Sequence, residues 1–426
     1  MNEKHGPLVI LPNPAARAHA SFVAVVTDPD VYREIFTRSD IWRGVKIMFN
    51  GIKGHASRRL AYSMTRLRGA RHAHYRRLLM PMLKRGAVEA QSEAMAATIA
   101  DHVRHWPRGA PVDLPPLTER LAHDLSVQFL FGNDRQRALP IADMIRRQGE
   151  GNWYSAVLRH LAWLPLANRQ EQAIMRWAEA LRGRVDMGNV VSILANSPDE
   201  NGEPPSREII GGLTSFIFGA SFDTCQNGLA WTLILLTQHP EIAESLATEI
   251  RSAVGTGLAT IERIGELPLL DGVVKESLRL FPPVPLQGRR AMMPTTVAGE
   301  PIADRTLALV SIHAMCRNPV VFPDPDRFVP TRWRGLDLTP YAYPVFGVGA
   351  YMCPGMLFGT QMIKLGVAAI LSRCSIAAAP GARIDYRTAI TLAPRGKVQV
   401  VLADAEKPVR WQAVRGAFRG LVELPN

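Results

Sequence analysis

A cysteine at the end of a glycine-rich turn is the residue in this sequence best placed for chemistry. The segment FGVGAYMCPG, residues 346–355, brings Cys353 directly before an apolar pattern that predicts a helix from Pro354 to about Ser372. Proline suits the first helical turn, because its missing N–H would have no partner there. The free N–H groups and the dipole of a helix N-terminus favour a cysteine thiolate. We therefore expect Cys353 to bind a soft or borderline metal ion, and the alternative is an inert buried cysteine.

An acid and an alcohol stand side by side in the longest predicted helix, which covers residues 207–237. Asp223 and Thr224 follow Ala220 and Ser221, and the two turns before them are almost wholly apolar. Small side chains let a flat ligand approach the helix backbone, and an acid–alcohol pair suits proton delivery. The alternative is a solvent-facing Asp223 and a Thr224 packed in the core.

Glu276 and Arg279 share one face of a helix predicted over residues 269–280, which ends before two prolines. At spacing i, i+3 the two side chains can form an ion pair. Such pairs usually lie on solvated helix faces. Here the flanking residues are apolar, and Arg332 follows in the segment FVPTRW.

The spacing of apolar residues predicts a mainly α fold with small β-sheets. Further helices are expected over residues 28–37, 73–83, 87–105, 117–131 and 241–254, with a weaker helical region over 141–194. Short alternating stretches predict strands at 295–302, 306–311 and 398–402. Residues 314–350 contain six prolines and no predicted element, which is typical of a functional loop.

Composition favours an intracellular globular protein. The chain has 426 residues, of which 47% are hydrophobic, so it can bury a large core. Its four cysteines form no CxxC pair and are too few for a disulfide framework. The apolar stretch over residues 209–236 contains Asp223, Gln226 and Asn227, which indicates a buried helix and not a membrane span. Without a secretory pattern at the N-terminus, we expect a cytoplasmic protein with no membrane anchor.

Positive charge is concentrated in one stretch of the chain. The net charge is +12, yet no acidic residue occurs between Asp40 and Glu89, where twelve Arg and Lys residues lie. Such a block fits an anionic substrate, an acidic partner protein, nucleic acid or a solvated basic face. Nucleic-acid binding also requires a docking motif, and the sequence has no helix-turn-helix, zinc-finger or aromatic RNP pattern. We therefore expect no nucleic-acid partner.

The turn that carries Cys353 closely resembles the haem-binding signature of the cytochrome P450 family of haem-thiolate monooxygenases, roughly F-x-x-G-x-[HR]-x-C-x-G. It matches at Phe346, Gly349, Cys353 and Gly355. It departs at Tyr351, where the family usually has His or Arg facing a haem propionate. The resemblance implies that Cys353 binds the iron of haem b, iron protoporphyrin IX. The residues expected around this cofactor include Phe346, Gly347, Tyr351 and Gly355.

Other family motifs follow in order along the chain. His72 and Arg76, at i and i+4, resemble a pair that meets one haem propionate. Arg289 resembles an arginine that reaches a propionate, with its neighbour Arg290 as the alternative. The family's buried structural triad, which holds the segment near the cysteine loop, is matched by Glu276, Arg279 and Arg332.

The longest predicted helix resembles the family pattern A-G-x-[DE]-T. Ala220, Asp223 and Thr224 match it, and Ser221 replaces the usual glycine. The resemblance implies that Thr224 hydrogen-bonds dioxygen or its water and that Asp223 relays protons from solvent. It also implies that the haem lies between this helix and the helix after the cysteine loop.

The resemblance extends over the whole chain. We therefore expect residues 1–426 to form a single domain, with residues 403–426 as an extension packed on its body. O2 is the implied co-substrate. A separate ferredoxin or flavodoxin, with its reductase, is the implied electron donor. Its acidic surface is expected to meet a basic rim made of Arg76, Arg77, Lys84 and Arg85.

The resemblance implies a hydrophobic small-molecule substrate, whose identity the motifs do not give. In the family, the segment between residues 28–37 and the helix with His72 closes over the pocket. Here that segment contains Arg43, Lys46, Lys53, Arg58, Arg59 and Arg66. We therefore expect a carboxylated terpenoid, a fatty acid or a carrier-bound acyl group, and the alternative is surface charge directed away from the pocket. A haem-thiolate peroxygenase or isomerase is the alternative activity, against which the Asp223–Thr224 pair favours O2 chemistry.

Overall fold

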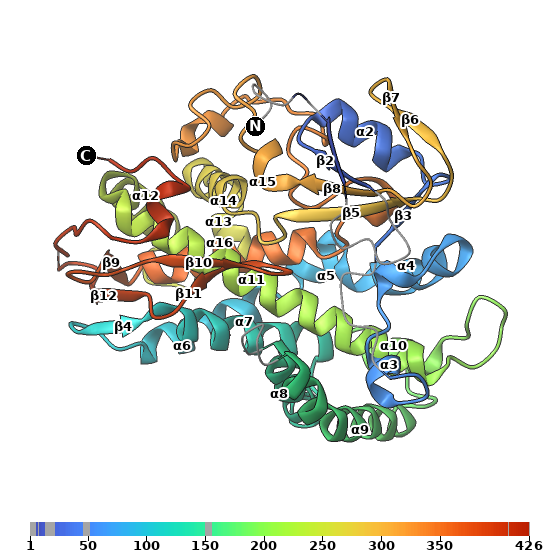
Figure 1. Cartoon of the computed structure of the whole chain (residues 1–426). Coiled ribbons are helices and arrows are strands. Elements are labelled where there is room, and N and C mark those ends of the chain that lie inside the picture. Colours follow the sequence, from blue (N-terminus) through green and yellow to red (C-terminus); the bar gives the residue numbers. More distant parts are fainter. Residues whose placement is uncertain are drawn as a thin grey trace.

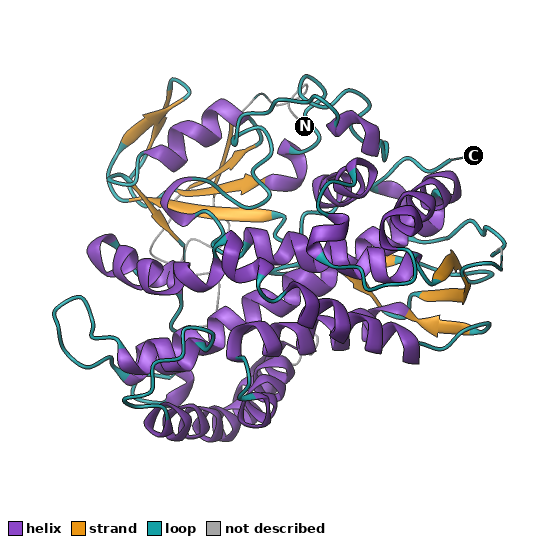
Figure 2. Ribbon diagram, turned by 180° about the vertical axis from the view of Figure 1, so that it is seen from behind, coloured by secondary structure: helices purple, strands orange, loops and turns teal. Residues whose placement is uncertain are grey.

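The computed structural model describes residues 6, 8–12, 22–45, 52–149, 156–407 and 409–425. About half of the chain is helical, and the strands lie at two sides of the molecule (Figure 1; Figure 2). The fold is mainly α with small sheets, as predicted. The helices are α2 (Pro29–Thr37), α3 (Ala56–Leu60), α4 (Gly69–Leu83), α5 (Arg85–Glu89), α6 (Ser92–His105), α7 (Leu114–Phe131), α8 (Arg135–Gly149), α9 (Ala156–Ala180), α10 (Val190–Asn196), α11 (Leu213–Gln238), α12 (Pro240–Val254), α13 (Ile261–Ile264), α14 (Pro268–Leu280), α15 (Ile312–Met315) and α16 (Met356–Leu371).

The strands form small, separate sheets. The largest has the order β1 (Leu8–Pro12), β2 (Phe22–Val26), β8 (Leu307–Ser311), β5 (Leu286–Ala291) and β3 (Trp42–Gly44). Within it β2 and β8 are parallel, and the other pairs are antiparallel. A second sheet joins β4 (Pro111–Asp113), β12 (Gln399–Asp404) and β9 (Cys374–Ala378). Two hairpins pair β6 (Thr295–Val297) with β7 (Glu300–Ile302) and β10 (Asp385–Thr388) with β11 (Leu392–Arg395).

The central helix α11 runs through the middle of the molecule (Figure 1). Its second half is buried on all sides, so it shows no amphipathic pattern. Glycines let it approach α16: a Cβ added at Gly228 would lie 2.6 Å from Ile363, and one at Gly366 would lie 3.0 Å from Leu229. Within the described ranges, neither α11 nor any other helix is long and apolar enough to cross a membrane.

Several predicted helices have different bounds in the structure; for example, the helix predicted over residues 73–83 begins at Gly69 and the one over 117–131 begins at Leu114. The helix predicted over residues 207–237 begins as a π-helical turn, η3 (Glu208–Gly212), and then continues as α11. The helix predicted over residues 87–105 is divided into α5 and α6. The helix expected to begin at Pro354 begins at Met356, so Cys353 lies in the preceding loop. A hydrogen bond from the N–H of Cys353 to the carbonyl of Phe346 keeps the cysteine in that loop.

The C-terminal residues pack against the helical body. Phe418 is fully buried, and its ring stacks on Trp231 and Phe281 at centroid distances of 5.9 and 5.4 Å. Arg317 donates a hydrogen bond to the carbonyl of Leu421 at 2.7 Å. The tail therefore adds an aromatic layer to the core around α11.

Gly272 lies where an added side chain should destabilise the fold. Its Cβ position in α14 is 2.3 Å from the carbonyl oxygen of Pro330, in the short helix η4 (Pro330–Trp333). Gly272→Ala should lower the free energy of unfolding by about 1–3 kcal/mol, as measured by urea unfolding. Gly86→Ala in α5 is the control, because no atom lies within 4 Å of that Cβ position. Equal stability of the two variants would contradict this prediction.

Candidate active site

The loop that carries Cys353 is closed by its own backbone. The N–H of Cys353 donates to the carbonyl oxygen of Phe346 at 2.7 Å. Gly347 and Gly349 have φ angles of +69° and +65°, a region that glycine adopts without steric cost. The turn η5 (Gly349–Tyr351) then leads into the cysteine. Glycine at these two positions therefore fixes the direction in which the loop presents Cys353.

Cys353 as a residue is exposed, yet the surrounding protein desolvates its thiol. Desolvation raises the pKa of this thiol, whereas the N–H of Gly355 and the charge of Arg76 act in the opposite direction. Cys353 lies in the loop before α16, which begins at Met356, and not in the first turn of the helix. A coordinated metal ion would remove the thiol proton outright.

Two residues of α4 contact the cysteine loop. Nη1 of Arg76 donates to the carbonyl oxygen of Met352 at 2.8 Å. The rings of His72 and Tyr351 lie 4.5 Å apart, and the hydroxyl of Tyr351 donates to the carbonyl of Leu67 at 3.4 Å. Burial and the charge of Arg76 lower the pKa of His72. The structure therefore brings His72, Arg76 and Tyr351 together beside the cysteine.

Arg289 of β5 approaches the same loop from the sheet. Its guanidinium carbon lies 4.0 Å from the ring centroid of Phe36 and 5.3 Å from that of Tyr351. Burial lowers the pKa of Arg289, and no carboxylate in the described part of the chain pairs with it. Arg290 instead donates to the carbonyl of Arg305, because adjacent strand residues face opposite sides. A desolvated guanidinium without a counter-ion fits an anionic group such as a haem propionate.

The polar residues of α11 are fixed by local hydrogen bonds. The hydroxyl of Thr224 donates to the carbonyl of Ala220 at 2.8 Å. Ala220 is exposed, although the helix that carries it runs through the middle of the molecule. Ser221 donates to the carbonyl of Phe218 at 2.8 Å. These hydroxyls thus bond to the helix backbone, and their oxygen atoms keep acceptor capacity.

Asp223 is held by residues that sequence analysis missed. One carboxylate oxygen accepts from Gln226 at 2.9 Å, and the other accepts from the hydroxyl of Thr391 at 2.9 Å. Gln226 lies at i+3 in the same helix and could have been found by spacing. Thr391 lies between β10 and β11, far along the chain, and the sequence carries no signal for this contact.

Cys225 links the central helix to the helix after the cysteine loop. It is buried in α11, and its sulfur lies 3.4 Å from the Cβ position of Gly359 in α16. Burial raises the pKa of Cys225 to about 12, and the nearby Cys353 also acts to raise it. Thr224, the preceding residue, therefore lies in the same region of the molecule as the cysteine loop.

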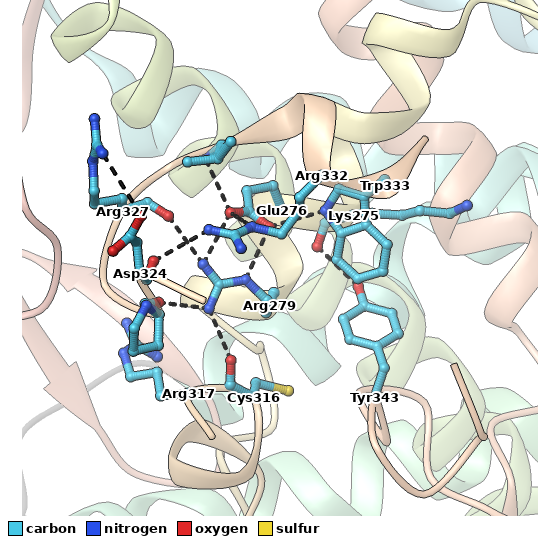
Figure 3. A network of polar contacts seen from close by, with 12 residues as sticks. Lys275, Glu276, Arg279, Cys316, Arg317, Asp324, Arg327, Arg332, Trp333 and Tyr343 are labelled. Atoms are coloured by element: carbon cyan, nitrogen blue, oxygen red, sulfur yellow. Dashed lines mark hydrogen bonds and ion pairs between the residues drawn. The ribbon is translucent and has the colours of Figure 1, made fainter. Parts of the chain in front are cut away.

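The residues predicted as a structural triad form a buried network in a different region (Figure 3). Glu276 and Arg279 have no accessible surface, and two hydrogen bonds of 2.9 Å join them. Nε of Arg332 donates to Glu276 at 2.9 Å. Trp333, which the sequence analysis did not assign, also donates its indole N–H to Glu276 at 2.9 Å. Arg279 donates further to the carbonyls of Cys316, Pro325 and Arg327.

The donor set around Cys353 fits one kind of metal centre. Among the residues that the structure describes, no three His, Cys, Asp or Glu side chains are grouped to hold a metal ion. A single cysteine ligand suits an iron whose remaining ligands come from a porphyrin, and the basic residues His72, Arg76 and Arg289 suit its propionates. The loop and its surroundings thus fit a haem-thiolate centre.

Comparison with known proteins gives the family. The family model for cytochrome P450 matches residues 166–399. The chain therefore belongs to the cytochrome P450 family and is an oxidoreductase of the monooxygenase type. It is 26% identical over 396 residues to cyclooctat-9-en-7-ol 5-monooxygenase of Streptomyces melanosporofaciens, covering 88% of this chain and 84% of the relative. Cyclooctatin synthase of the same organism is 28% identical over 348 residues, covering 76% and 74% of the two chains.

Solved structures agree on the fold. The retinoic acid-bound cyanobacterial CYP120A1 superposes with a TM-score of 0.79 at 19% identity, covering 95% of this chain and 93% of that one. The cytochrome P450DA heme domain gives a TM-score of 0.77 at 19% identity, with 93% and 90% covered. The predicted fold class is therefore confirmed.

Substitutions in the Glu276 network should destabilise the protein by amounts that depend on which contact is lost. Glu276→Gln leaves the buried charge of Arg279 uncompensated, so we expect a loss of about 3–5 kcal/mol in the free energy of unfolding. Trp333→Phe removes one hydrogen bond to a charged acceptor and should cost less, about 1.5–3 kcal/mol. Denaturant unfolding of both variants measures the difference. A Glu276→Gln protein as stable as wild type would contradict this interpretation.

Proposed function

We propose that the chain uses haem b and O2 to oxidise a C–H bond of a hydrophobic small molecule. The observation that carries this proposal is the closed loop that presents Cys353 next to His72, Arg76 and Arg289. When bound, the haem iron would supply the activation of dioxygen. Sγ of Cys353 would be its protein ligand, and Phe346, Gly347 and Gly355 would shape the loop around it. We propose that residues 1–426 form one domain and act in the cytoplasm.

Residues of the chain would bind the charged groups of the cofactor and form hydrogen bonds in the site. His72, Arg76 and Arg289 would bind the propionates by hydrogen bonds and charge. Tyr351 stands where the family usually has a cation, and it would contribute packing against His72 instead. Thr224 would accept a hydrogen bond at its hydroxyl oxygen while it donates to Ala220.

Asp223 would pass protons between solvent and the site. Gln226 and Thr391 hold its two carboxylate oxygens, and these oxygens keep further lone pairs that could accept a proton.

The proposed substrate class is a terpenoid-like or carboxylated apolar molecule. Curated relatives include proteins named germacrene A hydroxylase and amorpha-4,11-diene 12-monooxygenase, at 34% and 32% identity over 39% and 43% of this chain. The acid-free stretch supports a negatively charged group on the substrate. Within it, Arg59 is already paired with Glu171, so it offers less to a ligand than its neighbours. Lys46 lies outside the described residues.

The electron donor would dock where α4 reaches the cysteine loop. A depression of about 470 Å³ on this helix is lined by Ala73, Arg76, Arg77, Met80, Pro81 and Lys84. Met352 and Met356, on either side of Cys353, are 38% and 40% exposed. An apolar centre with a basic rim suits an acidic ferredoxin or flavodoxin.

The reduced CO difference spectrum tests the haem-thiolate assignment. Wild-type protein should show a thiolate-type Soret band, and Cys353→Ala should lose it because the sulfur ligand is gone. Cys374→Ala removes a buried cysteine of β9 and should keep the band. A haem-loaded wild type without the band would refute the proposal. Turnover with hydrogen peroxide but not with a reductase would favour a peroxygenase.

Reversing charge on the rim should slow electron transfer. Arg77→Glu and Lys84→Glu should each lower the second-order rate constant for reduction by a ferredoxin about 10-fold at low salt, since rim charges govern association. Stopped-flow absorbance measures this rate. Reduction by dithionite should not change. Arg120→Glu, an exposed arginine of α7, is the matched control. Equal rates for all three variants would place the donor elsewhere.

A further inference from the structure

The carboxylate of Asp223 in the central helix is held by neutral groups. One oxygen accepts from the amide of Gln226 and the other from the hydroxyl of Thr391, both at 2.9 Å. The amide of Asn227 lies 3.5 Å from the first of these oxygens. In the described part of the chain, no Arg, Lys or His side chain forms an ion pair with Asp223. No fixed cation therefore ties this carboxyl group to its ionised form.

Glu276 shows the opposite arrangement in the same protein. Its carboxylate accepts from two guanidinium groups, an indole N–H and a backbone N–H. Each of these groups can only donate, so none could accept a hydrogen bond from a protonated acid. Such partners suit a structural carboxylate that stays ionised. The partners of Asp223 are of another kind.

The hydroxyl of Thr391 can bond to both forms of a carboxyl group. A hydroxyl donates one hydrogen bond and also accepts. In the structure, Thr391 donates to Oδ2 of the ionised Asp223. When this oxygen carries a proton, the acid can donate to the hydroxyl oxygen in return, and neither side chain has to leave its place. The contact therefore suits an acid that gains and loses a proton.

The turn that carries Thr391 is fixed to the body of the molecule. Thr391 is 9% exposed and lies between β10 and β11. The carbonyl of the next residue, Leu392, accepts from the indole N–H of Trp231 in α11 at 3.0 Å. The N–H of Leu392 donates to the carbonyl of Pro283 at 2.9 Å. These two backbone contacts keep the Thr391 hydroxyl within reach of Asp223.

The C-terminal residues hold the other end of the same hairpin. The N–H of Ala417 donates to the side chain of Asp385, the first residue of β10, at 2.8 Å. The N–H of Phe418 donates to the carbonyl of Ile384 at 3.1 Å. Both ends of the hairpin are thus anchored, as a side chain that positions another one requires.

We infer that Thr391 is a positioning residue for Asp223: its hydroxyl keeps the carboxyl group in one place while a proton enters and leaves it. This inference rests on the proposed function, in which Asp223 passes protons between solvent and the site. A proton taken from solvent is bound at a carboxylate oxygen and is then released toward the site, so both side chains end unchanged. The inference assigns control of this acid to a hairpin that is distant in the sequence.

Oxidation of guaiacol by hydrogen peroxide tests the inference on the haem-loaded protein, because the peroxide gains protons when it is reduced to water. Thr391→Val removes the hydroxyl at nearly constant volume. It should lower kcat about 10-fold, a fraction of what a positioned proton donor contributes, and leave KM for peroxide unchanged. The solvent deuterium isotope effect on kcat should rise. Thr391→Ser should restore both values, and Thr388→Val, at an exposed threonine of β10, is the matched control.

A double variant shows whether Thr391 acts through Asp223. Asp223→Asn should itself lower kcat, and Thr391→Val added to it should lower kcat no further, because two residues that act as one unit are not additive. Crystal structures give a readout apart from turnover. The carboxyl group of Asp223 should keep its place in Thr391→Ser and leave it in Thr391→Val.

Several outcomes would overturn the inference. They are an unchanged kcat and isotope effect in Thr391→Val, a Thr391→Ser protein as slow as Thr391→Val, equal slowing by Thr388→Val, and independent losses in the double variant. An Asp223 carboxyl group that keeps its place in Thr391→Val overturns it on structure alone. The CO difference spectrum separates these outcomes from failure of the proposed function, because only that failure removes the thiolate-type band from wild type.

Discussion

One buried carboxylate, that of Glu276, holds together the part of the molecule that leads to the cysteine loop. It accepts hydrogen bonds from Arg279, Arg332, Trp333 and the backbone N–H of Val329. Because Glu276 and Arg279 have lost all contact with solvent, the protein must replace their hydration completely. A buried pair of this kind adds little net stability over apolar residues of the same volume, but it excludes arrangements that leave either charge alone.

The Glu276 network also positions the segment that leads to Cys353, which has little regular structure. Arg279 binds three backbone carbonyls before η4, and the hydroxyl of Tyr343 donates to the carbonyl of Lys275 at 3.0 Å. Helix α14 therefore holds the segment near both ends. The loop hydrogen bond between Cys353 and Phe346 follows directly. Because backbone contacts set the direction of the thiol, the ligand position is organised by the fold, as a binding site requires.

Sequence patterns predicted the features that depend on residues close together in the chain, such as helices and ion pairs within one helix. The spacing of Glu276 and Arg279 gave their ion pair, and apolar periodicity gave most helices with errors at their ends. Trp333 was missed although it adjoins an assigned arginine, because spacing does not show that an indole N–H points at a buried acid. Thr391 could not be found, since its contact with Asp223 is created when the chain next to β11 packs against α11. The strands β1 and β9 are short, and their pairing partners follow from tertiary structure.

The acid-free stretch shows most clearly how tertiary structure divides a feature that looks uniform in sequence. Arg59 and Arg71 form ion pairs with Glu171 and Glu200, which lie in distant segments, and so help to hold these segments together. Arg76 donates to the backbone carbonyl next to Cys353 and so helps to hold the cysteine loop in place. The positive charge of this stretch is therefore divided among separate structural roles and does not act as one uniform patch.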